Sequence, residues 1–278
     1  MAQPTPSLYT LDPALPVLLR PDGAVQLGWS PRRAVVIQPP RGVTAAGLAT
    51  LLRAMHSPVS ISELQRHSDV SPGELDDLLA QLVTAGVATR GARQRATRSA
   101  SIRVHGRGPL SELLAEGLRC SGARIKQSNQ PHAAVTAADA DLVVLSDNLV
   151  ADPRMLRDLH SQGVAHLAVR VRDGTGLVGP LVVPGVTSCL GCADLHRRDR
   201  DAAWPAVAAQ LRDTVGVADR ATLLATAALA LSQVNRVIGA VRGAESEPPT
   251  SLNATLEFDV HAGSIVVRQW PKHPLCSC

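Results

Sequence analysis

A chain of 278 residues has room for one large domain or two modest ones, and it can bury a substantial core. Hydrophobic residues make up 45% of the chain but aromatic residues only 2%, so we expect a core of Ala, Val and Leu. This composition excludes a disordered chain, and the formal net charge of +4 is too small to imply nucleic-acid binding by itself.

The N-terminus and the apolar runs bear on localisation. No basic segment followed by an apolar run opens the sequence, so we expect no secretory signal. The longest apolar stretch, residues 221–231, is shorter than the roughly 20 residues that a membrane helix needs. We therefore expect a cytoplasmic protein without a membrane partner. In that compartment paired thiols are metal ligands or redox groups more often than disulfides.

The first third of the chain predicts a small α+β module. Short apolar runs separated by turn residues predict antiparallel strands between residues 14 and 40. Three helices follow, which Thr44, Ser60 and Ser71 are placed to begin. The third helix carries four leucines on one face and ends near Gly86. This order resembles that of a winged-helix domain, with the wing starting after Gly86.

A polar stretch at residues 89–100 predicts a linker, because it holds Arg90, Arg93, Arg95 and Arg98 among small polar residues. We place the domain boundary there, which gives a module of residues 1–97 and a second domain of residues 98–278.

Strands and helices alternate beyond the linker. We expect strands at 101–105, 123–125, 141–145 and 165–170, with helices at 111–121 and 152–162 between them. This alternation predicts an α/β fold with a mostly parallel sheet covered by helices. Residues 177–183 predict one arm of a hairpin, residues 220–241 a long buried helix, and residues 252–259 and 264–269 a closing antiparallel pair.

Two cysteine pairs are the sharpest chemical feature. Four thiolates suit Zn²⁺, which they bind tetrahedrally at about 2.3 Å, and Gly191 inside the first pair lets the backbone fold tightly. A redox CxxC, unrelated buried thiols, or His273 in place of one thiol are the alternatives. The fifth cysteine, Cys120, is interpreted as core filler on a helix. We predict one structural zinc bound by Cys189, Cys192, Cys276 and Cys278.

The sequence from Gly106 to Ser111 follows a strand and opens a helix, the context in which a GxGxxG turn binds phosphate. Gly106 and Gly108 are present, but Ser111 replaces the third glycine. About twenty residues on, where a carboxylate would bind a ribose, the chain has Lys126 to Asn129 and no acidic residue. We interpret the turn as a degenerate Rossmann turn kept for folding, with a working nucleotide site as the alternative.

The order of these pieces resembles the ThiF-like family, which includes ubiquitin-activating enzymes and bacterial adenylating relatives. The run ending in Asp147-Asn148 looks like the family's Asp-Asn near magnesium and nucleotide. The Pro-Gly that precedes Cys189-Leu-Gly-Cys192 looks like its zinc knuckle. The match covers about residues 101–278 and implies that Gly106, Gly108 and Asp147 form the nucleotide site.

More narrowly, the sequence from Cys189 to Asp199 with Trp204, and the ending from Trp270 to Cys278, resemble the cyclodehydratase-associated proteins of azole-modified peptide clusters. The resemblance implies a winged-helix peptide-binding module before a fold that no longer adenylates, a homodimer, and a YcaO partner that performs the ATP-dependent chemistry. Adenylating members use an arginine and a lysine near the nucleotide, and Lys126 is the only internal lysine here. We therefore expect zinc but not ATP or magnesium as cofactor, and no independent catalysis.

Three functions compete. The first is a scaffold that binds a precursor or leader peptide as an added strand and presents it to a modifying enzyme. The second is an ATP-dependent adenylating enzyme that uses Gly106, Gly108 and Asp147. The third is a DNA-binding regulator, although the third predicted helix carries three acidic residues and no Arg or Lys, a poor surface for DNA. We interpret the charged run at residues 196–201 as a solvated loop or a partner contact.

Overall fold

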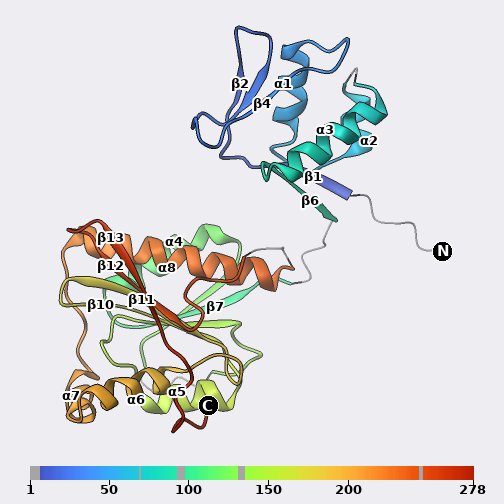
Figure 1. The fold of residues 1–278 in the computed structure, drawn as a ribbon. Helices are drawn as coiled ribbons and strands as arrows, with labels where there is room; N and C mark the ends of the chain where they lie inside the picture. The colour runs from blue at the N-terminus through green and yellow to red at the C-terminus, as the bar shows by residue number, and fades with distance from the viewer. Residues whose placement is uncertain (1–6, 69, 93–97, 131–134, 244–246) are drawn as a thin grey trace. The chain divides into compact units, whose positions relative to one another are not determined.

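The computed structural model describes residues 7–68, 70–92, 98–130, 135–243 and 247–278. The chain divides into two compact units, residues 1–95 and 96–278 (Figure 1). Residues 93–97 of the predicted linker, with Arg93 and Arg95, lie outside the described residues. The linker prediction is wrong for residues 89–92, which pair with the first strand of the chain.

The first unit holds two three-stranded antiparallel sheets and three helices. One sheet has the order β5 (Val59–Ser60), β1 (Ser7–Leu11), β6 (Ala88–Ala92), and the other the order β2 (Val17–Leu19), β3 (Val25–Leu27), β4 (Val35–Ile37). The second sheet contains the predicted strands. Strand β1 is not predicted, because its partners Ser60 and Gly91 lie far along the chain and give it no local signal.

The helices of this unit begin where expected. They are α1 (Ala45–Ala54), α2 (Ile61–Arg66) and α3 (Pro72–Thr84). The side chains of Thr44, Ser60 and Ser71 each accept a backbone N–H of the first helical turn. The four leucines of α3 are buried in a core shared with α1 and both sheets, and α3 ends where Gly86 takes a φ of 70°.

A mixed seven-stranded sheet forms the second unit. Its order is β13 (Ser264–Gln269), β12 (Ala254–Asp259), β11 (Thr175–Val182), β10 (His166–Arg172), β9 (Leu142–Ser146), β7 (Ser101–His105), β8 (Arg124–Ser128). The strands from β8 to β10 are parallel, and those from β10 to β13 pair antiparallel. The α/β class is confirmed, but the expected mostly parallel sheet is half antiparallel. Asp173 and Gly174, both with positive φ, turn the chain directly back from β10 into β11.

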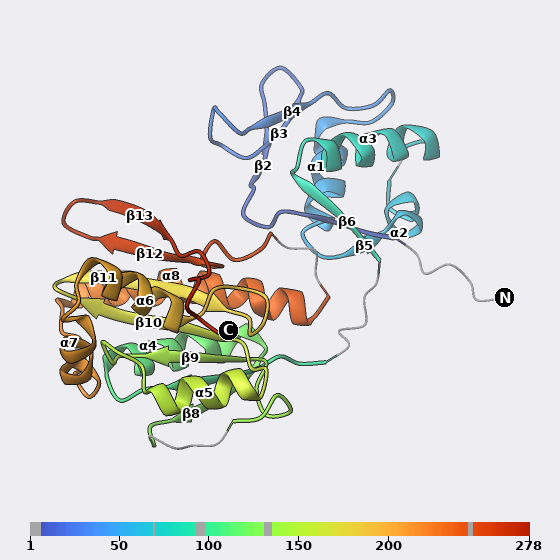
Figure 2. The ribbon, with the colours of Figure 1, turned by 60° about the horizontal axis from the view of Figure 1, so that its bottom comes forward.

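Helices cover both faces of this sheet. The helices α4 (Pro109–Leu118) and α8 (Arg220–Val241) pack together on one face, and α5 (Pro153–Ser161), α6 (Leu190–Arg200) and α7 (Trp204–Leu211) lie on the other (Figures 1 and 2). Strand β9 is buried throughout and sends alternate residues into each layer: Leu142 and Val144 toward α4 and α8, Val143 and Leu145 toward α5 and α6.

Within the described residues, α8 alone is long and apolar enough to cross a membrane by length and composition. Eight of its residues are buried, and it packs against α4, β10 and β11. These contacts are those of a core helix. Its outward face is open, with Leu224 46% exposed, so the helix predicted to be buried is buried on one side only.

Candidate functional site

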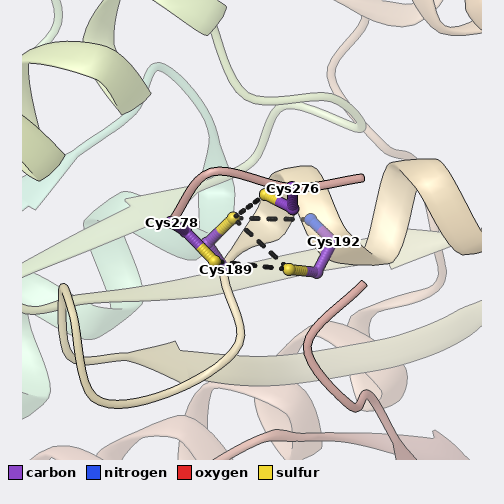
Figure 3. A group of neighbouring side chains, drawn as sticks. All are labelled: Cys189, Cys192, Cys276 and Cys278. Atoms are coloured by element: carbon purple, nitrogen blue, oxygen red, sulfur yellow. Dashed lines mark hydrogen bonds between the residues drawn. The ribbon is translucent and has the colours of Figure 1, made fainter. Parts of the chain in front are cut away.

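The four cysteines of the two pairs converge at one point (Figure 3). Their sulfur atoms all lie within 4.8 Å of one another, with Cys189 3.9 Å from Cys192 and 3.5 Å from Cys276, and Cys192 3.4 Å from Cys278. Four sulfurs at about 2.3 Å from one tetrahedral ion would lie about 3.8 Å apart. All are free thiols, too far apart for a disulfide. The residues fit a tetrahedral metal site.

The first pair begins helix α6. The sulfur of Cys189 accepts the backbone N–H of Cys192 at 3.4 Å, so it caps the helix that carries its neighbour. A Cβ on Gly191 would lie 3.3 Å from the sulfur of Cys189 and 3.8 Å from that of Cys276. Glycine therefore serves this turn by leaving space beside the sulfurs.

The second pair is brought to α6 by the end of the chain. Trp270 is buried, its backbone N–H donates to Asn253, and its indole N–H donates to Thr255. A turn follows in which the N–H of Cys276 donates to the carbonyl of His273. These contacts position two thiols that lie more than 80 residues beyond the first pair in sequence.

His273 supports the cluster through its backbone. Its backbone N–H donates to the sulfur of Cys192 at 3.3 Å. Its ring atom Nδ1 accepts the N–H of Leu275, and Nε2 lies 2.7 Å from Asp199. Both ring nitrogens are therefore engaged, which disfavours the alternative in which His273 replaces a thiol.

Asp199 belongs to the charged run at residues 196–201. That run is the carboxyl-terminal half of α6 and not the expected loop. Seventy-four positions separate Asp199 from His273, so no local spacing could have revealed their contact.

The thiols differ in their environments. Burial raises the pKa of Cys189 and of Cys278. Burial opposes ionisation of Cys192 too, but the backbone N–H of His273 and contacts with the neighbouring cysteines lower its pKa to about 7. The most buried pair thus combines one thiol that ionises near neutral pH with one that resists ionisation in the absence of a cation.

The fifth cysteine takes no part in the cluster. Cys120 lies in a short 3₁₀ turn (Arg119–Ser121) after α4 and is exposed. The interpretation of Cys120 as core filler is wrong, because α4 ends at Leu118 and Cys120 lies in the exposed turn that follows.

The glycine turn packs against Asp147. A Cβ on Gly106 would lie 2.4 Å from Oδ2 of Asp147, and a Cβ on Gly108 would lie 2.7 Å from Oδ1. Asp147 itself has a φ of 73° and is 1% exposed. The two glycines therefore allow the backbone of the turn to approach a buried carboxylate.

That carboxylate occupies the amino-terminal end of α4. Its oxygens accept the backbone N–H of Leu110 at 2.9 Å and that of Ser111 at 3.3 and 3.4 Å. The hydroxyl of Ser111, at the position of the missing glycine, donates to the carbonyl of Gly108. In a nucleotide-binding turn such N–H groups donate to a phosphate, whereas here they donate to groups of the chain itself.

A cavity of about 410 Å³ lies beside this turn. Glu112 lines it, together with Arg107 and the neutral side chains of Gln127, Ser128 and Asn129. The carboxyl end of β8, the position of a ribose-binding acid in a Rossmann fold, thus lines the cavity with amide and hydroxyl groups, while the carboxylate in the lining, Glu112, belongs to α4.

No protein-family model and no curated protein matches the chain. Among solved structures, it is similar to a heterocyclase in complex with substrate and cofactor (TM-score 0.66, 16% identity) and to the heterocyclase TruD (0.66, 15%), with 98% of this chain but 39% and 42% of theirs covered. It is also similar to E. coli MccB in complex with MccA-N7isoASN (0.61, 14%), covering 97% of this chain and 99% of MccB. These similarities establish a shared fold, and the chain spans about two-fifths of the heterocyclases' length.

Proposed function

We propose that this protein is a non-catalytic, zinc-stabilised scaffold that binds a precursor or leader peptide and presents it to a YcaO-type cyclodehydratase. The first unit acts as a winged-helix module that binds the peptide. The second unit is a ThiF-type domain with a Rossmann-like turn, and Cys189, Cys192, Cys276 and Cys278 bind its structural zinc. The protein works in the cytoplasm, where thiols stay reduced.

The observation that carries this proposal is the surface of the sheet β2-β3-β4. In the described part of the first unit, every exposed large apolar side chain lies in or beside this sheet: Leu18, Leu19, Trp29 and Val36. Trp29 is 80% exposed and Val36, on the edge strand β4, is 49% exposed. An edge strand beside apolar side chains suits an added peptide strand, because backbone pairing supplies affinity and the side chains supply selectivity.

The glycine turn supports a role without catalysis. Its N–H groups are occupied by Asp147, and Glu112 would repel phosphates in the adjacent cavity. A nucleotide would have to displace a buried, hydrogen-bonded carboxylate before it could bind.

The comparisons support a role for this chain beside a catalytic part. The chain covers about two-fifths of two heterocyclases, one of them in complex with substrate and cofactor. In our proposal a YcaO-type protein supplies the catalytic part that lies outside the matched two-fifths of such an enzyme.

The proposal is tested by titrating the full chain with labelled peptides encoded by short reading frames beside its gene. We expect Val36→Asp to weaken peptide binding at least about tenfold, because a charge on the edge strand opposes apolar contacts. Val186→Asp is the matched control, since Val186 is 73% exposed in the second unit. Failure of the wild-type chain to bind these peptides, and of a neighbouring YcaO protein to bind the chain, would refute the proposal.

Adenylation is the second candidate, because the chain covers nearly all of MccB, which has also been solved with ATP. Calorimetric titration with ATP and Mg²⁺, followed by pyrophosphate exchange in the presence of peptide, separates the two functions. Exchange that Gly108→Val abolishes would establish adenylation in place of the scaffold.

Two further expectations have their own tests. A homodimer predicts a sedimentation-equilibrium mass of twice 29.2 kDa. A DNA-binding role is disfavoured, because Glu74, Asp76 and Asp77 lie on α3 and no basic residue does. A gel shift on generic DNA that weakens with salt would revive that role.

A further inference from the structure

A second cavity, of about 390 Å³, lies on the face of the large sheet that α5, α6 and α7 cover. It adjoins the loop after β9 and the end of β10, so it sits at the carboxyl ends of two parallel strands, where α/β proteins place ligands. The cysteine cluster lines a different cavity. None of the functions considered above uses this cavity.

Its two walls differ in chemistry. One wall is apolar and is formed by Val150, Ala151, Leu156, Leu190 and Leu211. The other carries five arginines against three carboxylates, an excess of two positive charges: Arg170, Arg172, Arg197, Arg200 and Arg268 against Asp194, Asp201 and Glu257. A cavity of this size with one apolar and one cationic wall suits a small amphipathic anion.

Most of the charged residues that line the cavity are paired within the chain. Arg197 donates to Asp194 at 2.8 Å, and its guanidinium stacks over Trp204 and Trp270. Arg268 makes two hydrogen bonds to Glu257, which also lies 3.8 Å from Arg172. The carboxylates of Asp194 and Glu257 are therefore already paired with these arginines.

Arg170 is the exception. It is 8% exposed, yet across the described ranges its guanidinium has neither a hydrogen bond nor an ion pair. Burial, with the nearby charge of Arg197, lowers its pKa to about 10 against the attraction of Asp194 and Glu257, so it remains charged at pH 7. A guanidinium that is largely removed from bulk water and lines a cavity can present its N–H donors to a ligand there.

We propose that this cavity is a binding site for an oxyanion, in which Arg170 receives a carboxylate or phosphate group while the apolar wall holds the body of the ligand. Carboxylate and phosphate share the geometry that a guanidinium pairs with in bidentate fashion. The site lies wholly in the second unit, so it is independent of peptide binding by the sheet β2-β3-β4.

The test measures the thermal unfolding of the full chain with three probes. N-acetyl-leucine imitates a peptide carboxyl terminus with an apolar side chain, N-acetyl-leucinamide is its neutral match, and inorganic phosphate represents the other source. We expect N-acetyl-leucine, phosphate or both to raise the midpoint, and the amide to leave it unchanged. The responding probe identifies the source of the anion.

Substitutions assign the effect to Arg170. Arg170→Met should weaken the responding anion roughly tenfold or more, the loss expected for charge-assisted hydrogen bonds. Arg170→Lys keeps the positive charge but lacks the planar guanidinium, and it should retain part of the response. Arg154→Met on the exposed side of α5 is the control. Without anion, Arg170→Met should unfold at the same or a higher temperature, which shows that the variant is folded. No response to either anion, or an equal response in Arg170→Met, would overturn the proposal.

Discussion

The cysteine cluster and the glycine turn lie in the same unit, and short sequence motifs indicated both. They differ in whether their binding groups already have strong hydrogen-bond partners within the chain. The four sulfurs converge within 4.8 Å, with only weak N–H and thiol contacts. The N–H groups of Leu110 and Ser111 already donate to Asp147. An unpaired, convergent set can bind a ligand directly, whereas a paired set must first lose its internal partner. A motif thus indicates binding where the fold leaves its donors unpaired.

The largest effect should come from breaking the cysteine cluster. We expect the wild-type chain to bind about one zinc ion and Cys192→Ser to bind none. The substitution should also lower the free energy of unfolding by more than about 3 kcal/mol. That loss is a fraction of the roughly 10–16 kcal/mol that structural zinc contributes in small domains. The reason is that zinc connects α6 to the end of the chain. Elemental analysis of the purified protein and urea unfolding measure the two quantities.

Cys120→Ser is the matched control, because Cys120 is exposed and lies outside the cluster. It should retain zinc and stability. A wild-type chain that is purified with added zinc and binds none would show that convergence of four thiols is insufficient here.

A substitution in the glycine turn should lower stability because it disrupts packing, and not because a ligand is lost. In Gly106→Ala the new Cβ would meet Asp147 and Ser146 at 2.4 Å and the backbone oxygen of Ser146 at 2.8 Å. We expect the free energy of unfolding, measured by urea titration, to fall by about 1–3 kcal/mol, since the backbone cannot move aside as a flexible side chain can. Gly73→Ala, where a Cβ meets nothing within 4 Å, should change stability little. Equal effects of the two substitutions would contradict a tightly packed turn.

His166 extends the comparison to a buried ring in which Nδ1–H donates to the carbonyl of Val164, and the acceptor Nε2 has no partner among the described residues. It is fully buried, Nε2 lacks a hydrogen bond among the described residues, and burial lowers its pKa from 6.5 to about 4. Between these values the unfolded chain binds a proton that the folded chain does not. Stability should therefore fall as pH is lowered from 6.5 to 4, by up to about 1.4 kcal/mol per pH unit.

His166→Phe isolates this contribution from the protonation of the thiols. Its unfolding free energy, measured by urea titration at several pH values, should fall less steeply than that of the wild type over the same range. His261→Phe, at a side chain that is 82% exposed, is the control. Parallel pH profiles for His166→Phe and the wild type would show that another group dominates.

Local signals predicted most of the fold. The caps at Thr44, Ser60 and Ser71 and the limits of α8 were predicted correctly, because capping and periodicity act within one or two turns. Strand β1 was missed, since its pairing partners are distant in sequence. The hairpin arm at residues 177–183 was predicted, but its antiparallel pairing with β10 was not, although Asp173-Gly174 is a typical hairpin turn.

The candidate sites also combine features that the sequence predicts with features that it does not. Spacing within each cysteine pair indicated the cluster, and the four sulfurs lie within 4.8 Å of one another. The pairing state of a donor, by contrast, depends on contacts between remote elements. The carboxylate of Asp147 reaches a helix 36 positions earlier, and Arg170 lines a cavity formed by α5, β10, α6, α7, β12, β13 and the loop after β9. No pattern in the sequence distinguishes these two buried charged residues, one paired and one unpaired.

The smallest effect should come from Asp147 itself. In Asp147→Asn the side chain keeps its shape and one acceptor oxygen but loses the charge that faces the amino-terminal end of α4. We expect a loss of about 1 kcal/mol in urea unfolding, as for other helix-terminal charges and caps. Asp152→Asn, a similar substitution at the cap of the more exposed helix α5, should cost less. If Asp147 merely fills the place of a phosphate, the asparagine variant should begin to bind ATP in calorimetric titration. We expect it not to bind, because Glu112 remains beside the turn and no lysine lines the cavity.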